Sequence, residues 1–175
     1  MKNKRVLFGT DGVRDVANRG GMTPEMALRL GRVFILFLAE RGVPRPRIVL
    51  GRDTRRSGMM LEGALSAGMT SAGAEVLSAG IIPTPGVSYA VQHLAADGGA
   101  VISASHNPAE YNGIKFLDRN GCKLSDGSEL AIEDLDRAEK TPCSSRRFPA
   151  ILPRCNRRRR SINTRTKVAD RKSVV

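Results

Sequence analysis

The stretch Ile102-Ser103-Ala104-Ser105-His106-Asn107-Pro108 places two hydroxyls and an imidazole at one point of the chain. The apolar segment that precedes it, 98–102, begins with glycine and predicts a short buried strand. Proline fixes its own φ and moves the preceding residue out of the helical region, so residues 107–108 predict a turn. We therefore expect Ser105 and His106 where a strand runs into a loop, the position at which open α/β sheets bind ligands.

The simplest interpretation of this loop is a polar turn in which Ser103 or Ser105 caps the local backbone. Two cations favour another interpretation: Arg14 ends the tight, glycine-containing loop expected at 9–14, and Lys115 lies on an expected strand. The sequence has no P-loop, no dinucleotide-binding glycine pattern after its first strand and no His/Cys set with metal-ligand spacing. Because phosphoryl transfer depends mainly on positioning and positive charge, these residues suit a phosphorylated ligand or a phosphorylated serine.

The elements that must position these residues alternate between strand and helix. Thr23-Pro24-Glu25 predicts a helix start, because threonine caps a helix, proline fits its first position and glutamate favours its dipole. The alternation predicts parallel strand pairs joined by right-handed crossovers, and hence an α/β fold. Strands are expected at 5–8, 47–51, 75–77 and 98–102. Helices are expected after Thr23, after the charged loop 52–58 and after Pro83-Thr84-Pro85.

Beyond the serine loop the pattern changes. Two short apolar segments, 113–117 and 121–124, flank an Asp-Arg-Asn turn and predict a hairpin. Since alternate residues of a strand face opposite sides, Ile114 and Phe116 should face the core and Lys115 the loop side. A final amphipathic helix is expected from 126 to 140, with apolar positions at Leu130, Ile132 and Leu135.

The net charge of +12 is concentrated near the C-terminus. Residues 1–140 contain 18 Lys and Arg against 16 Asp and Glu, whereas residues 141–175 contain 11 Lys and Arg against one acid. The second segment includes a run of four arginines at 157–160 and shows no useful periodicity. We therefore divide the chain into a domain, 1–140, and a basic tail, 141–175, which is expected to be disordered.

The composition also bears on compartment and partners. The longest apolar run, 33–39, is far shorter than the ~20 residues of a membrane span, so no membrane partner is expected. The N-terminal stretch is basic and then apolar, but its apolar part is too short for a signal peptide. An odd number of cysteines without metal spacing (Cys122, Cys143 and Cys155) favours the reducing cytoplasm.

Six motifs in order resemble the first domain of the α-D-phosphohexomutases, and bacterial phosphoglucosamine mutases are the branch they match best. They are FGTDGVR at 8–14, TPE at 23–25, LGRDTRRSG at 50–58, PTPGV at 83–87, ISASHNP at 102–108 and YNGIKF at 111–116. The resemblance implies a three-layer α/β/α domain with a mostly parallel mixed sheet. It also implies a phosphosugar substrate, with glucosamine 6-phosphate and glucosamine 1-phosphate interconverted through a bisphosphate intermediate, for amino-sugar nucleotide and cell-wall precursor synthesis.

The resemblance also implies a role for each matching residue. Ser105 matches the serine that carries the transferred phosphate and, through that phosphate, binds Mg²⁺. Lys115 matches a lysine beside the transferring group, and Arg14 an arginine near the phosphoserine. His106 and Asn107 belong to the active loop, His106 among the catalytic residues and Asn107 among those that bind substrate or phosphate. Ser103 is expected to be structural.

The departures from the family pattern are equally informative. The family's magnesium loop, Asp-Gly-Asp-x-Asp-Arg, occurs nowhere in the chain, so the remaining Mg²⁺ ligands are expected in a missing second domain. Asp15 stands where the family has a glycine. We therefore expect a truncated mutase with little or no turnover of its own. The arginine-rich tail is typical of out-of-frame translation, which predicts a frameshift or read-through origin, with a genuine basic arm as the alternative.

Two alternatives remain open at this point. The chain could derive from a phosphomannomutase or phosphoglucomutase, because the loop that distinguishes the sugars is absent. It could instead be a non-catalytic anion-binding protein whose arginine tail, 141–175, binds nucleic acid in a salt-dependent way. Nucleic acid is the weaker expectation, because no aromatic residues are interleaved with the basic ones. The sequence does not determine the oligomeric state.

Overall fold

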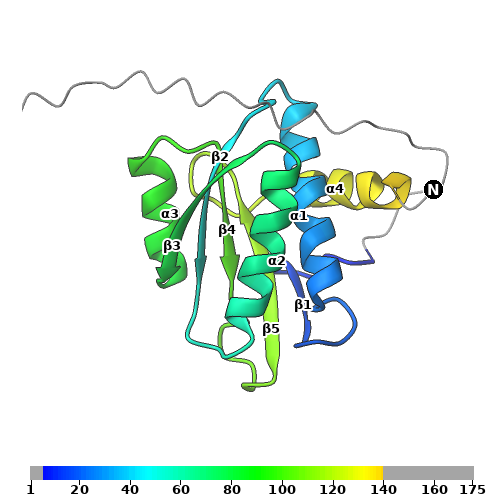
Figure 1. Cartoon of the computed structure of the whole chain (residues 1–175), viewed down its shortest axis with the longest axis vertical. Coiled ribbons are helices and arrows are strands. Elements are labelled where there is room, and N and C mark those ends of the chain that lie inside the picture. The colour runs from blue at the N-terminus through cyan, green and yellow to red at the C-terminus, as the bar shows by residue number, and fades with distance from the viewer. Residues whose placement is uncertain (1–5, 140–175) are drawn as a thin grey trace, which may run out of the picture.

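The computed structural model describes residues 6–139 of the chain (Figure 1). The elements are β1 (Val13–Val16), α1 (Pro24–Ala39), β2 (Arg47–Arg52), α2 (Gly58–Ser71), β3 (Glu75–Ile81), α3 (Thr84–His93), β4 (Gly98–Ile102), β5 (Tyr111–Leu117) and α4 (Asp126–Glu139). The expected basic tail, 141–175, lies outside the described residues. None of the helices in the described range combines the length and apolar character that a membrane span needs.

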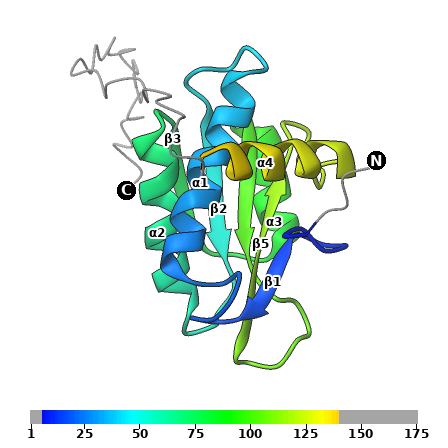
Figure 2. The ribbon, with the colours of Figure 1, turned by 90° about the vertical axis from the view of Figure 1, so that its right-hand side faces the viewer.

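The five strands form one mixed sheet in the order β1-β5-β4-β2-β3. β2 pairs in parallel with β3 and β4, while β5 is antiparallel to β4 and β1. α1 and α2 cover one face of the sheet and α3 the other, and α4 packs against α1 (Figure 2). The expected α/β/α class is confirmed, with half of the strand pairings parallel.

The strand residues alternate between two apolar clusters. Ile48 and Leu50 of β2 join the cluster beneath α1 and α2, whereas Val49 joins the cluster beneath α3. On the first side Phe34 stacks on Phe116 with 4.2 Å between ring centroids. Burying each such side chain contributes roughly 1.5–3 kcal/mol, so this packing fixes the position of β5 and of the residues it bears.

Two expectations about local structure need correction. The strand expected at 5–8 is wrong, because residues 6–8 form no strand and the first strand is Val13–Val16. The backbone N–H groups of 6–8 donate instead to the Glu133 carboxylate, so a carboxylate takes the place of a neighbouring strand. The expected hairpin is reduced to a single antiparallel bridge between Leu117 and Lys123.

The inner face of α4 also differs from expectation. Ile132 is buried, but Leu130 and Leu135 are only half-buried. Three acids are buried on the same helix, and each has a partner: Glu129 with Lys123, Glu133 with the 6–8 amides and Arg137, and Asp136 with Arg29. Polar pairing, as well as apolar packing, therefore holds α4 on the domain.

Candidate functional site

The expected site residues come from three neighbouring segments at one end of the sheet. β4 ends and β5 begins at this end, and the loop that joins them contains Ser105 (lower end in Figure 1). Lys115 of β5 pairs in register with Val101 of β4, and Arg14 of β1 pairs with Gly113. The sheet therefore brings two cations from adjacent strands to the serine loop.

A hollow of about 280 Å³ lies at this point. Its lining comprises Asp11, Arg14, Thr84, Val101, Ser103, Ser105 and Lys115. The hollow brings together three of the five expected site residues. The other two form hydrogen bonds with residues of the hollow. His106 Nδ1 lies 3.3 Å from Ser105 Oγ, and Asn107 Oδ1 accepts from Arg14 at 3.4 Å.

Ser105 is held in an unusual conformation. Its φ is +55°, in the left-handed region that non-glycine residues rarely adopt. Its backbone N–H donates to Ser103 Oγ at 3.1 Å, which gives Ser103 the structural role that the resemblance implied. Because backbone strain of this kind persists only where the surrounding structure imposes it, the turn that exposes the Ser105 hydroxyl is built into the loop.

Asp11 is the acidic residue in the lining of the hollow, and the sequence interpretation missed it. Its carboxylate lies 2.6 Å from Lys115 Nζ and 3.4 Å from a guanidinium nitrogen of Arg14. The two cations thus share one counter-charge beside an exposed serine. Asp11 was overlooked because Asp-Gly is a common turn dipeptide and because its pairing with Lys115 spans most of the domain.

Lys115 lies as strand alternation predicts. Its neighbours Ile114 and Phe116 are buried in the core, while Lys115 is half-buried on the side of the hollow. Arg14 was expected in a loop, but it lies on β1. Its position depends on the antiparallel pairing of β1 with β5, about which local sequence says little.

Arg55 is a second residue that the sequence interpretation missed. It lies in the charged loop after β2, and its side chain donates hydrogen bonds to four backbone carbonyls in the segment 105–111. An available clue was topological: β2 and β4 are parallel, and the carboxyl ends of parallel strands meet at the same edge of a sheet.

The residues around the hollow do not by themselves fit a magnesium ion. Mg²⁺ takes oxygen ligands in near-octahedral geometry. Residues 6–139 contain no group of three or more His, Cys, Asp or Glu side chains placed to hold a metal. Asp11 is the carboxylate that lines the hollow, and it is engaged by Lys115 and Arg14. Ser105 therefore offers a donor oxygen without the carboxylates that would complete a site.

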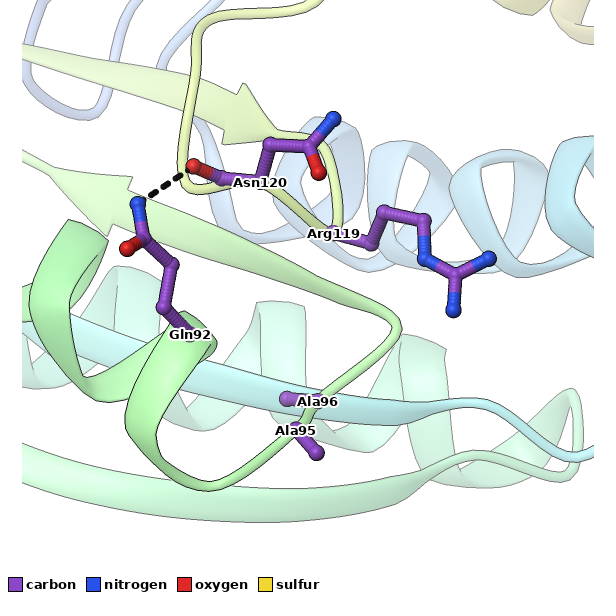
Figure 3. A pocket seen from close by; sticks show the side chains of 5 residues that line it. All are labelled: Gln92, Ala95, Ala96, Arg119 and Asn120. Carbon is purple, nitrogen blue, oxygen red and sulfur yellow. Dashed lines mark hydrogen bonds between the residues drawn. The ribbon is translucent and has the colours of Figure 1, made fainter.

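A second hollow, of about 450 Å³, lies at the opposite end of the sheet (Figure 3). It lies between the residues that precede β4 and those that follow β5, and the Gln92 side chain crosses it to donate to the Asn120 carbonyl at 2.6 Å. Arg119 is the charged residue in its lining.

Comparison with known proteins relates most of the chain to one protein family. A family model described as phosphoglucomutase/phosphomannomutase, alpha/beta/alpha domain I, matches residues 5–142. A phosphoglucosamine mutase of Thermoanaerobacter sp. (strain X514) is 57% identical over 129 residues, which is 74% of this chain and 28% of the relative. A phosphoglucosamine mutase of Anaeromyxobacter sp. (strain Fw109-5) is 50% identical over 153 residues, or 87% of this chain and 32% of the relative.

A solved structure of the same family superposes on most of the chain. A phosphoglucomutase/phosphomannomutase family protein from Burkholderia thailandensis superposes with a TM-score of 0.67 at 26% identity, over 77% of this chain and 30% of that one. The chain thus spans about 30% of the length of the relatives that it matches.

Proposed function

Since the chain belongs to the phosphoglucomutase/phosphomannomutase family, whose domain I it matches over residues 5–142, we propose that it supplies the phosphoserine-bearing part of a phosphosugar mutase. The proposed reaction interconverts glucosamine 6-phosphate and glucosamine 1-phosphate. The observation that carries the proposal is the hollow in which the exposed Ser105 adjoins Arg14 and Lys115. The names of the curated relatives support the choice of sugar.

The proposed step is transfer of a phosphoryl group from Ser105 to a hydroxyl of the sugar phosphate. The sugar oxygen attacks phosphorus, the bond between phosphorus and Ser105 Oγ breaks, and the sugar proton ends on Oγ. The product is a sugar bisphosphate. After the bisphosphate reorients, the reverse step returns its other phosphoryl group to Ser105, so the serine is regenerated in each cycle.

Lys115 and Arg14 stabilise the charge on the transferring group in this scheme. Their side chains come from adjacent strands, so the sheet fixes them before the substrate arrives, and such preorganised charge lowers the barrier to phosphoryl transfer. His106, 3.3 Å from Ser105 Oγ, is placed to exchange a hydrogen bond with that oxygen. Asn107 orients Arg14 through its side-chain oxygen.

Other parts of the relatives complete the proposed site. The Ser105 phosphate is the donor that this part of the chain offers to Mg²⁺, and the remaining metal ligands and the groups that recognise the sugar belong to the rest of the family's length. We place the reaction in the cytoplasm, where sugar phosphates are metabolised.

A chimera tests the proposal. Residues 1–140 of this chain replace the matching part of the Thermoanaerobacter relative, and isomerisation of glucosamine 6-phosphate is measured together with phosphate incorporation at each serine. We expect activity with phosphate on Ser105, loss of both in Ser105→Ala, and retained incorporation in Ser103→Ala. A chimera that folds and is fully active with Ser105→Ala contradicts the proposal. Glucose and mannose phosphates in the same assay test the other sugars of the family.

A further inference from the structure

We propose that Arg55 is a positioning residue that holds the Ser105 loop in the conformation needed for phosphoryl transfer. The inference rests on the function proposed above. It identifies the group that maintains the geometry of the loop, a role separate from those of Arg14 and Lys115, which line the hollow itself.

Four backbone carbonyls of the loop converge on the Arg55 guanidinium. One terminal nitrogen donates to the carbonyls of Pro108, at 2.6 Å, and Tyr111, at 3.0 Å. The other donates to those of Ser105, at 3.0 Å, and Asn107, at 2.8 Å. A planar guanidinium presents several donors in a fixed arrangement, so a single side chain can fix the relative positions of four peptide groups.

Arg55 is itself held in place. Its Nε lies 3.1 Å from one Asp53 carboxylate oxygen, and its backbone N–H donates to the other at 3.0 Å. The backbone N–H of Asp53 donates to the carbonyl of Ile102, the last residue of β4. The Arg55 side chain is 12% exposed. The guanidinium is thus anchored to the same strand from which the serine loop departs.

The base of the loop is closed independently of Arg55. The backbone N–H of Ser103 donates to the Gly113 carbonyl at 2.9 Å, and Ile102 of β4 pairs in register with Ile114 of β5. Loss of the guanidinium should therefore loosen the loop between these ties without separating β4 from β5.

The exposed part of the loop depends on polar contacts for its placement. Ser105, His106 and Pro108 are exposed, so apolar packing contributes little to their placement. Ser105 also has a φ of +55°, which a serine does not adopt without support from its surroundings. The hydrogen bond from Arg55 to the carbonyl of Ser105 acts directly at that residue.

The adjacent arginine provides a matched control. Arg56 is exposed, and it follows Arg55 in the same loop. Arg55→Gln and Arg56→Gln remove the same charge from neighbouring positions. A difference between the two variants therefore reports the contacts of the guanidinium and not the net charge.

The first experiment uses the full 175-residue chain and measures amide hydrogen exchange. The amides of Asn107 and Tyr111, which bond to carbonyls within the loop, are expected to exchange roughly tenfold faster or more in Arg55→Gln. Arg56→Gln should match the unaltered chain. Arg55→Lys should exchange at an intermediate rate, because one ammonium cannot span four carbonyls. Unchanged exchange in Arg55→Gln, with the core protected as before, overturns the positioning role.

The second experiment uses the chimera described above and separates positioning from a purely structural role. In Arg55→Gln we expect kcat to fall by roughly tenfold to a hundredfold, with KM unchanged within about twofold, because misplacement of a reacting group slows transfer without weakening substrate binding. A loosened loop with unchanged kcat overturns the link to phosphoryl transfer. An inactive parent chimera, together with the expected exchange pattern in the chain, counts against the proposed function and leaves the loop-holding role of Arg55 standing.

Discussion

The carboxylate of Asp11 lies 2.6 Å from the ammonium of Lys115, on the same hollow as Ser105. A second oxygen of that carboxylate lies 3.4 Å from Arg14. Asp11 therefore balances the two cations that a phosphate group would meet in the hollow. A phosphate that enters must compete with this carboxylate for both of them.

Asp11→Asn should consequently strengthen binding of inorganic phosphate to the chain. Removing one competing charge from partly exposed pairs is worth roughly 0.5–1 kcal/mol, which corresponds to an affinity gain of about two- to fivefold. The measurement is a phosphate titration followed through the backbone amide resonances of Arg14 and Lys115. Asp134→Asn, an exposed acid on α4 with its own partner in Arg137, is the control for net charge. Equal or weaker binding in Asp11→Asn would show that Asp11 does not compete with phosphate.

The sequence predicted those parts of the fold that depend on local patterns. Thr23 caps α1, accepting from the backbone N–H of Met26 as expected. Strand alternation placed Lys115 opposite Ile114 and Phe116, and the structure agrees. These features follow from residue types and spacings that are visible in any short window of sequence.

Contacts between segments that are distant in the sequence could not be predicted from such local patterns. β1 pairs with β5 across about 100 positions of sequence, so Arg14 was assigned to a loop. The four acceptors of Arg55 are backbone carbonyls, which every residue has and which therefore leave no trace in residue types. The burial of the acids of α4 was not predicted, because their partners, such as Arg29 for Asp136, lie on other elements.

Glu133 links α4 to the N-terminal segment, and its loss should destabilise the domain. Its carboxylate accepts from the backbone N–H groups of Val6, Leu7 and Phe8 and pairs with Arg137. Burial alone raises the pKa of Glu133, but these hydrogen bonds outweigh it and hold the pKa below its ordinary value of 4.5. Glu133→Gln keeps the shape of the side chain and removes the charge, and should lower the free energy of unfolding by about 1–3 kcal/mol at neutral pH.

The pH dependence gives this prediction a definite sign. A carboxyl with a lowered folded-state pKa stabilises the fold above its unfolded-state pKa, and this stabilisation is lost as the pH falls from about 4.5 through the folded-state value. Denaturant unfolding of the 175-residue chain should therefore show a smaller loss of stability between pH 6 and pH 3 in Glu133→Gln than in the parent. Asp134→Asn, on the same helix but half exposed, should keep the parental slope. A parental slope in Glu133→Gln would contradict the assignment.

Asp15 stands where the family resemblance leads one to expect glycine, and the structure gives it a local role that can be tested. Its carboxylate accepts from the backbone N–H of Gly21 at 3.0 Å and from that of Val16 at 2.7 Å, and so closes the turn that follows β1. The hydrogen bonds from Gly21 and Val16 hold the pKa of Asp15 below its ordinary value of 3.8, although burial opposes them. The carboxylate also fills the space beside Gly20, where an added methyl carbon would lie 2.0 Å from its oxygen.

Asp15→Gly should therefore lower the free energy of unfolding by about 1–2 kcal/mol, since it removes both hydrogen bonds and adds backbone freedom in a strand. The difference from the parent should be present at neutral pH and should shrink as the pH falls below about 3.8, because the parent then loses the same charge. Thermal unfolding of both chains at several pH values measures this difference in stability. Gly20→Ala should be destabilising in the parent but less so in Asp15→Gly, because the carboxylate that blocks the methyl group is gone. If Gly20→Ala costs the same in both backgrounds, the carboxylate does not occupy the turn.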